Sequence, residues 1–281
     1  MLASRWIHPK RFIHRSIPMA LPVVLLAVSS CLAREVETPS LPDLTGQWAM
    51  VQVMPAIAEL PFLGSTMLVT TVYALVDVVQ TGAEVVMQDA YCFTDVEMKP
   101  PHIESEVPER FMRSLAPAPR LATLEIQERE VLFTQDWVTE VRGARLENPE
   151  SDPLPIGTYD SRVYDQDGDG HPGLTIPVTA LGLVSGDTYV VHRLRYRLAG
   201  AVIDSHTILG TMEWSSEQNV LSATDAILMM NYTFRLDPDL SKHRFVMQRI
   251  DGSPTCEMLR AVSHELLDLL SAPLPPCTMA R

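Results

Sequence analysis

The sequence predicts a mainly β protein of the α+β class, in which an antiparallel sheet forms a sandwich or a barrel. Segments rich in Val, Thr, Tyr and other strand-forming residues follow one another, and short turn signals separate them. Strands and helices do not alternate regularly along the chain, which disfavours a parallel sheet of βαβ units. We therefore expect an antiparallel sheet with a few short helices and one helix near the C-terminus.

A strand and a long hairpin open the expected sheet. Residues 46–54 alternate between apolar and polar side chains around Trp48 and predict the first strand. Residues 67–80 and 84–96 are apolar and β-branched, and the glycine-containing segment 81–83 between them is typical of a turn. These two segments predict a hairpin.

A short helix and a second hairpin follow. Residues 106–115 carry apolar side chains at helical spacing and are closed by prolines, which predicts a helix. Residues 121–127 and 130–141 predict two paired strands. The proline-punctuated segment 148–157 predicts a loop and is a candidate subdomain boundary.

The second half of the chain predicts further strands and the C-terminal helix. The expected elements are strands over 174–183, 188–198, 202–214 and 243–250, with a turn at Ala199 and Gly200 and a short helix over 223–230. Ser253 is a candidate N-cap for a helix that runs to Leu270. We expect a single β-rich domain over 45–271 and a proline-rich tail over 272–281.

The composition is that of a folded protein, with 46% apolar residues in a chain of 281. The formal net charge is −13. A charge of this sign repels nucleic acid and anionic membrane surfaces and attracts divalent cations. We therefore expect no nucleic-acid partner.

The N-terminus has the three parts of a secretory signal. Four basic residues precede an apolar run over 17–28, which is too short to span a bilayer. Two small residues, Ser29 and Ser30, then precede Cys31. This order predicts export from the cytoplasm.

The segment from Val28 to Cys31 also resembles the lipobox of bacterial lipoproteins. In that family the cysteine is acylated and becomes the new N-terminus, so the resemblance implies a signal peptide over 1–30, lipidation at Cys31 and a lipidated tether over 31–44. Leucine, rather than the retention signal aspartate, follows the cysteine. The resemblance therefore implies a protein of the bacterial cell envelope, lipid-anchored at the outer membrane.

Four cysteines are present, namely Cys31, Cys92, Cys256 and Cys277. An exported location permits disulfides. If Cys31 carries lipid, three cysteines remain and one of them has no partner within the chain. Spacing leaves both Cys92 with Cys256 and Cys256 with Cys277 open.

The most specific chemical motif is an aspartate-rich loop over 165–173. Asp165, Asp167 and Asp169 alternate with other residues, so their carboxylates can surround one hard cation, and Gly170 permits a sharp turn. The loop resembles the DxDxDG calcium loops of thrombospondin type 3 repeats and dockerin-like modules. That resemblance implies Ca²⁺ bound by the three carboxylates and by the backbone carbonyl of His171.

The loop departs from an EF-hand at its twelfth position. Ile176 stands where an EF-hand has a bidentate glutamate, and no helical pattern flanks the loop. Asp160 and Asp187 are candidates for the remaining ligand. Because three close carboxylates repel one another unless a cation neutralises them, we expect structural calcium rather than a solvated turn.

Arg193, Arg195 and Arg197 occur at alternate positions, so on a strand all three project from one face. A row of arginines can hold an anionic ligand. The alternative that we favour is cross-strand pairing with acids such as Asp204 or Glu213.

The segment Gly46-Gln47-Trp48 resembles the GxW motif of lipocalins. In lipocalins this tryptophan packs at the closed end of an eight-stranded barrel against a late arginine, and the resemblance implies Arg244 or Arg249 in that role. It also implies a barrel able to hold one small ligand.

These observations favour a lipid-anchored protein outside the cytoplasm, with a calcium-stabilised β-rich domain that has a binding or structural role. The expected partner is a surface protein or a small ligand. The alternative is a lipocalin-like barrel that carries a small apolar ligand in an apolar cavity. A metal-dependent hydrolase using His171 or His192 as base ranks lowest, because the loop supplies hard oxygen ligands typical of structural calcium. The sequence also has no GxSxG, HExxH, Walker or GxGxxG motif.

Overall fold

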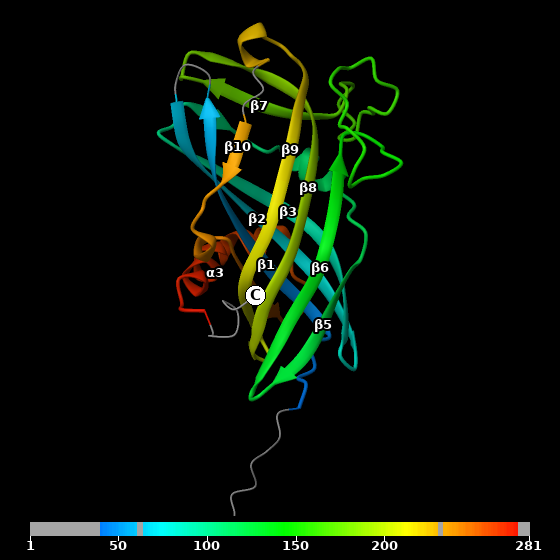
Figure 1. Ribbon diagram of the computed structural model, residues 1–281, viewed down its shortest axis with the longest axis vertical. Coiled ribbons are helices and arrows are strands. Elements are labelled where there is room, and N and C mark those ends of the chain that lie inside the picture. The colour runs from blue at the N-terminus through cyan, green and yellow to red at the C-terminus, as the bar shows by residue number, and fades with distance from the viewer. Residues whose placement is uncertain (1–39, 61–63, 230–232, 275–281) are drawn as a thin grey trace, which may run out of the picture. The chain divides into compact units, whose positions relative to one another are not determined.

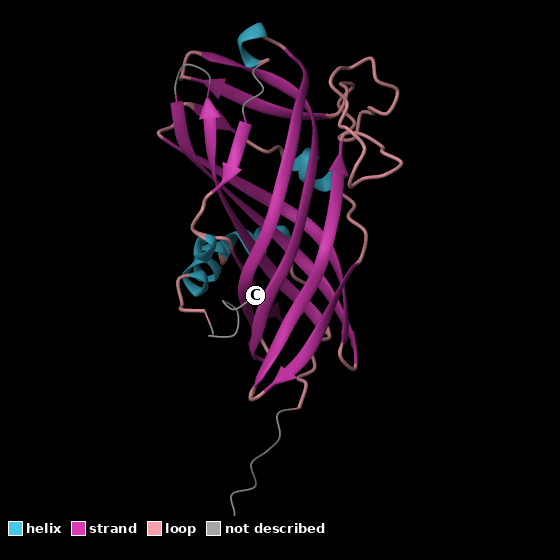
Figure 2. Cartoon of the chain, in the orientation of Figure 1, coloured by secondary structure: helices cyan, strands magenta, loops and turns pink. Residues whose placement is uncertain are grey.

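The fold is mainly β, as the sequence predicted (Figures 1 and 2). The structure is a computed structural model, and it describes residues 40–60, 64–229 and 233–274. The described residues form one compact unit, and the proline-punctuated segment 148–157 lies within it. The strands are β1 (Gly46–Leu60), β2 (Gly64–Thr81), β3 (Glu84–Lys99), β4 (Ile103–Ser105), β5 (Arg120–Gln127), β6 (Glu130–Arg142), β7 (Leu174–Ala180), β8 (Val184–Asp204), β9 (Thr207–Ala223), β10 (Thr233–Leu236) and β11 (Arg244–Ile250). The helices are α1 (Glu109–Ser114), η1 (Ala226–Leu228), η2 (Leu240–Lys242), α2 (Cys256–Ala261) and α3 (Ser263–Leu270).

Eight of the strands close into a ring. The antiparallel order β8-β6-β5-β3-β2-β1-β11-β9 is completed by pairing of β9 with β8, which leaves a barrel rather than a sandwich. β7 and β6 pair with successive parts of the same edge of β8, and β10 and β11 share one edge of β1 in the same way. One end of the barrel therefore has β7, β4 and β10 in its wall.

Two of the irregularities in the strand pairing change which side chains face inward. The register shift between β2 and β3 leaves Cys92 as an extra residue, and the shift between β6 and β8 leaves out residues 136–137. On β3, inward residues are odd-numbered before the shift, such as Met87, and even-numbered after it, such as Val96. Because the inward positions change from odd to even numbers at the shift, side chains from both halves of the strand line the inside of the barrel.

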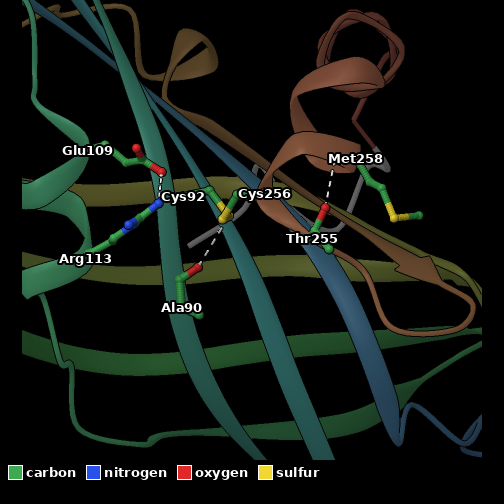
Figure 3. The surroundings of a disulfide bond; sticks show 7 residues. All are labelled: Ala90, Cys92, Glu109, Arg113, Thr255, Cys256 and Met258. Carbon is green, nitrogen blue, oxygen red and sulfur yellow. Dashed lines mark hydrogen bonds and ion pairs between the residues drawn. A yellow bond between two sulfur atoms is a disulfide. The ribbon is translucent and has the colours of Figure 1, made fainter.

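Helices α2 and α3 cover part of the outer face of the barrel (Figure 1, orange to red). Leu259, Leu266 and Leu270 pack there against outward side chains of β1, β2, β3 and β11. The disulfide joins Cys92 of β3 to Cys256 at the start of α2, so the pairing that the sequence left open is Cys92 with Cys256 (Figure 3). The N-cap is Thr255, whose hydroxyl accepts from Met258 N, rather than the expected Ser253.

The structure corrects the expected hairpin in the second half of the chain. β8 continues through Ala199 and Gly200 to Asp204, and the turn lies at Ser205 and His206. Gly200 faces Gly210 across the strand pair, and a Cβ on either would come within 3.0 Å of the Phe245 ring. Gly200 is therefore needed for close packing inside the barrel. The sequence around it does not distinguish this role from that of a glycine in a turn.

Other elements differ in extent. The helix expected over 223–230 is the single 3₁₀ turn η1, and the C-terminal helix is interrupted at Val262 between α2 and α3. The short strands β4 and β10 were not expected. Both pair with longer strands at the end of the barrel, so their formation depends on partners distant in sequence.

Candidate functional site

The end of the barrel that contains β7, β4 and β10 encloses a cavity of about 190 Å³. Inward side chains of the barrel strands form most of its wall, and Phe111 and Met112 of α1 and Leu228 of η1 complete it. Apolar residues dominate the lining. They are Met54, Leu68, Val72, Val96, Met98, Ile103, Val107, Phe111, Met112, Ile176, Val178, Ala180, Val190, Leu194, Trp214, Val220, Leu228 and Phe234.

The polar lining is sparse and mostly neutral. Three threonines, two serines, one glutamine and His192 contribute, and among the described lining residues Arg142 is the one charged side chain. His192 shares a hydrogen bond of 2.6 Å with the Ser216 hydroxyl. Burial, together with the charge of Arg142, lowers the pKa of His192 to about 3, so the imidazole is neutral at physiological pH.

A buried polar network lies beneath the cavity, in the middle of the barrel. Arg142 Nη2 donates to Glu140 Oε2 at 2.6 Å. Glu140 Oε1 also accepts from the hydroxyls of Tyr91, at 2.7 Å, and Tyr196, at 3.2 Å. Burial raises the pKa of the Glu140 carboxyl, but the contact with Arg142 and the hydrogen bond from Tyr91 outweigh it, so the pKa is lowered. The network therefore holds an ionised pair in the interior.

A second buried pair lies beside the first. Arg120 Nη2 donates to Asp89 Oδ1 at 2.6 Å, and Arg120 also donates to the Gln135 amide oxygen. The two charged side chains are 1% and 0% exposed, so neither charge has access to water. Burial raises the pKa of Asp89, and the contact with Arg120 opposes that rise. Each charge of the pair depends on its partner.

The opposite end of the barrel is closed around Trp48. Gly46 has a φ of +142°, a backbone conformation that favours glycine, and the segment before it crosses the barrel end. Trp48 Nε1 donates to Leu44 O at 2.8 Å, and both side chains are fully buried. Arg249 lies over the indole and donates to the carbonyls of Asp43 and Thr45. Arg249 therefore takes the role that the GxW resemblance implied, whereas Arg244 donates to Ala272 O.

Apolar side chains surround the cavity end of the barrel. The β7–β8 turn exposes Leu181 and Leu183, and the segment around η1 exposes Ile227 and Met229 (Figure 1, top). Leu228 between the last two points inward and lines the cavity. The segment around η1 thus contributes to both the wall and the rim of the cavity.

The aspartate-rich loop brings its three carboxylates together outside the barrel. One ligand atom from each of Asp165, Asp167 and Asp169 lies within 4.8 Å of the others. Among the described residues this group includes neither Asp160, which pairs with Arg162 at 2.7 Å, nor Asp187. Arg110 of α1 already contacts the group, at 2.9 Å from Asp169 and 3.6 Å from Asp167.

The loop carboxylates are partly engaged by backbone groups. Asp165 accepts from Gly168, Asp169 and Gly170 N, and Asp167 Oδ2 accepts from Thr175 N. Asp167 Oδ1 is buried without a hydrogen-bond partner among the described residues, and burial raises the pKa of that carboxyl. His171 stacks on Tyr189, with ring centroids 4.4 Å apart. Ile176, at the twelfth position, lines the cavity instead of facing the loop.

The arginine row projects from one face of β8, as expected. Arg193 pairs with Glu217 and Arg197 with Glu213 across the β8–β9 ladder, and Arg195 lies over the Trp137 ring at 4.3 Å. The cross-strand interpretation is confirmed for Glu213, while the pairing with Glu217 was not foreseen. Asp204 accepts from His206 N instead.

Cys31 and Cys277 lie outside the described residues, so the structure has no bearing on lipidation at Cys31. None of the helices in the described part of the chain is long and apolar enough to cross a membrane. Searches of protein-family models, of curated proteins and of solved structures found no match to the chain.

Sequence reasoning did not single out Arg142 or Glu140. Their alternate spacing on a strand was a usable signal, because an ion pair at positions i and i+2 shares one face. Whether that face points into the barrel depends on the irregularity at 136–137, which no local sequence pattern predicts.

Proposed function

We propose that this protein binds a small, largely apolar ligand inside its barrel. The observation that supports the proposal is the cavity of about 190 Å³ with a predominantly apolar lining. Pockets for drug-sized ligands measure roughly 300–1,000 Å³, so a compact ligand suits this space. Burial of its apolar surface would supply the main driving force for binding.

The closed end supports the same function. Trp48, Leu44 and other buried apolar side chains, with the buried pair of Arg120 and Asp89, pack the interior outside the cavity. A closed barrel of eight strands has room for one small ligand. The buried ion pairs beneath the cavity limit how deeply an apolar ligand can enter the barrel, because deeper insertion would break the hydrogen bonds of these pairs.

The test is titration with the neutral fluorophore N-phenyl-1-naphthylamine. Val178→Trp fills the cavity from β7, and Thr179→Trp adds the same side chain to the other face of that strand. We expect saturable binding by the native protein and by Thr179→Trp, and at least a tenfold loss of affinity in Val178→Trp. Equal affinity of the two variants, or no saturable binding by the native protein, would contradict the proposal.

We also propose a structural calcium ion at the loop carboxylates. The buried and unpartnered Asp167 Oδ1, close to oxygens of Asp165 and Asp169, favours a cation there. Arg110 supplies a positive charge to the same carboxylates. When Ca²⁺ binds, Arg110 has to move away or share these carboxylates with the ion.

Thermal unfolding with millimolar Ca²⁺ and with chelator tests this site, because an ion that binds only the folded state raises the midpoint. We expect a rise for the native protein, a larger rise for Arg110→Gln, and none for Asp167→Asn combined with Asp169→Asn. Identical midpoints with Ca²⁺ and chelator in both the native protein and Arg110→Gln would exclude calcium at this loop.

For the location, we propose lipid attachment at Cys31 in a bacterial cell envelope, on the basis of the lipobox resemblance. Cys31→Ser should release the protein from the membrane fraction, whereas Cys277→Ser should not. Continued membrane association of Cys31→Ser would contradict the anchor.

A further inference from the structure

The charge of the cavity lining is unusual for this chain. The chain carries 35 acidic residues and a net charge of −13, yet none of the described lining residues is acidic. The one charged lining group is the Arg142 guanidinium. The interior therefore offers a positive charge to a ligand, within a protein that is negative overall.

Arg142 is held in place from beneath. Its Nη2 donates to Glu140 at 2.6 Å, and its guanidinium carbon lies 5.4 Å from the centroid of the Tyr91 ring. The side chain is 11% exposed. Fixing a guanidinium in this way lowers the entropy cost of its next hydrogen bond.

One donor of this fixed group is unused. Arg142 Nε is buried and has no hydrogen-bond partner among the described residues. Arg120 Nε, Arg195 Nε and Arg244 Nε also lack a partner among the described residues, and of these four arginines Arg142 is the one that lines the cavity.

Glu140, which pairs with Arg142, also accepts hydrogen bonds from other residues. Glu140 accepts from two tyrosine hydroxyls, of Tyr91 and Tyr196, in addition to Arg142. The other buried pair, Arg120 with Asp89, does not line the cavity. The Glu140 charge is thus stabilised by three donors, and of the two members of the ion pair only Arg142 lines the cavity.

The neighbour of Arg142 adds hydrogen-bonding capacity without a charge. His192 lies opposite Arg142 in the β6–β8 register and shares a hydrogen bond with Ser216. Both side chains line the cavity. Arg142, His192 and Ser216 therefore form one polar group in the cavity wall.

From this arrangement we propose that the ligand is a monocarboxylic acid with one apolar chain or ring body. Its carboxylate accepts hydrogen bonds from the Arg142 guanidinium at the inner end of the cavity, and its apolar part extends past Met54, Val96 and Phe111. A charge-assisted bond from the Arg142 guanidinium to a carboxylate is stronger than a hydrogen bond between neutral groups, and the apolar walls cover the rest of the ligand. This inference rests on the proposed ligand-binding function and adds the chemical class.

The experiment is displacement of N-phenyl-1-naphthylamine by decanoic acid and by decan-1-ol, which share one chain length and differ in the head group. At pH 7 we expect the acid to displace the fluorophore at a concentration at least tenfold lower than the alcohol. Fluorophore binding with equal displacement by acid and alcohol overturns the carboxylate inference and leaves ligand binding intact. Absence of fluorophore binding overturns both.

The role of Arg142 is tested with Arg142→Met combined with Glu140→Gln, which removes both charges and leaves no uncompensated ion. The matched control is Arg197→Met combined with Glu213→Gln, an ion pair on the outer face of the barrel. We expect the inner double variant to lose the preference for acid and the outer one to keep it. Retention of the preference by a folded inner double variant overturns the assignment to Arg142. If that variant does not fold, the tenfold criterion on the native protein still decides the ligand class.

Discussion

Arg249 lies over the indole of Trp48, with its guanidinium carbon 5.4 Å from the ring centroid, and joins the last barrel strand to the first. The same guanidinium donates to backbone carbonyls of Asp43 and Thr45, so it ties the segment before β1 across the closed end. Two distant parts of the chain are thereby fixed at one point.

Replacing Arg249 by Ala should destabilise the barrel by about 1–2 kcal/mol, because a cation–π contact and hydrogen bonds to two carbonyls are lost together. The measurement is urea unfolding followed by tryptophan fluorescence. Arg235→Ala is the control. The Arg235 side chain is 60% exposed, and its ion pair with Glu59 is long, at 3.8 Å, so the substitution should change stability by less than about 0.5 kcal/mol. Equal effects of the two substitutions would show that the closed end does not depend on Arg249.

The disulfide between Cys92 and Cys256 should stabilise the fold by about 2–5 kcal/mol, since it joins residues 164 positions apart. Reduction should lower the unfolding midpoint of the native protein and leave that of Cys92→Ser with Cys256→Ser unchanged. A non-reduced digest analysed by mass spectrometry identifies the bonded pair. A digest that linked Cys256 to Cys277 instead would contradict the structure.

The buried pair of Arg120 and Asp89 predicts a non-additive result. Arg120→Met should cost about 3–5 kcal/mol, because it leaves the Asp89 charge buried and unpaired. Arg120→Met combined with Asp89→Leu should recover most of this loss, since two apolar side chains replace two desolvated charges. Chemical unfolding of the two variants measures the difference, and a double variant less stable than the single one would contradict this account.

Much of the sheet could be predicted because each strand carries its own pattern. Residues 67–80 and 84–96 are rich in apolar and β-branched side chains on either side of a glycine turn, and β2 and β3 contain these segments. The role of Trp48 was also accessible, since Gly46 and Trp48 form a local motif and only the arginine partner had to be chosen. These features depend on short sequence separations.

The cavity could not be predicted, because its wall comes from segments far apart along the chain. The extra residue at Cys92 and the irregularity at 136–137 each reverse which side chains face inward, and neither has a local signal. Gly200 was misassigned as a turn because its reason lies in the Phe245 ring, 45 residues later. Long-range packing therefore decided the parts of the site that the sequence left undetermined.

The neutral His192 inside the cavity predicts a specific loss of stability in acid. Its pKa is lowered from 6.5 to about 3 by burial and by the charge of Arg142. Between these two values the unfolded chain binds one more proton than the folded protein, so the contribution of His192 to stability is complete above about pH 6.5 and is lost as the pH falls. The expected slope is about 1.4 kcal/mol for each pH unit below 6.5.

Urea unfolding between pH 7 and pH 4.5 measures this slope. His192→Gln can retain a hydrogen bond to Ser216 through its amide but cannot be protonated, so its stability should fall less steeply with pH than that of the native protein. His206→Gln, in the exposed β8–β9 turn, should leave the native slope unchanged. If His192→Gln and the native protein lose stability in parallel, protonation of His192 is not what limits the fold in acid, and the carboxylates of the two buried ion pairs become the groups to test next.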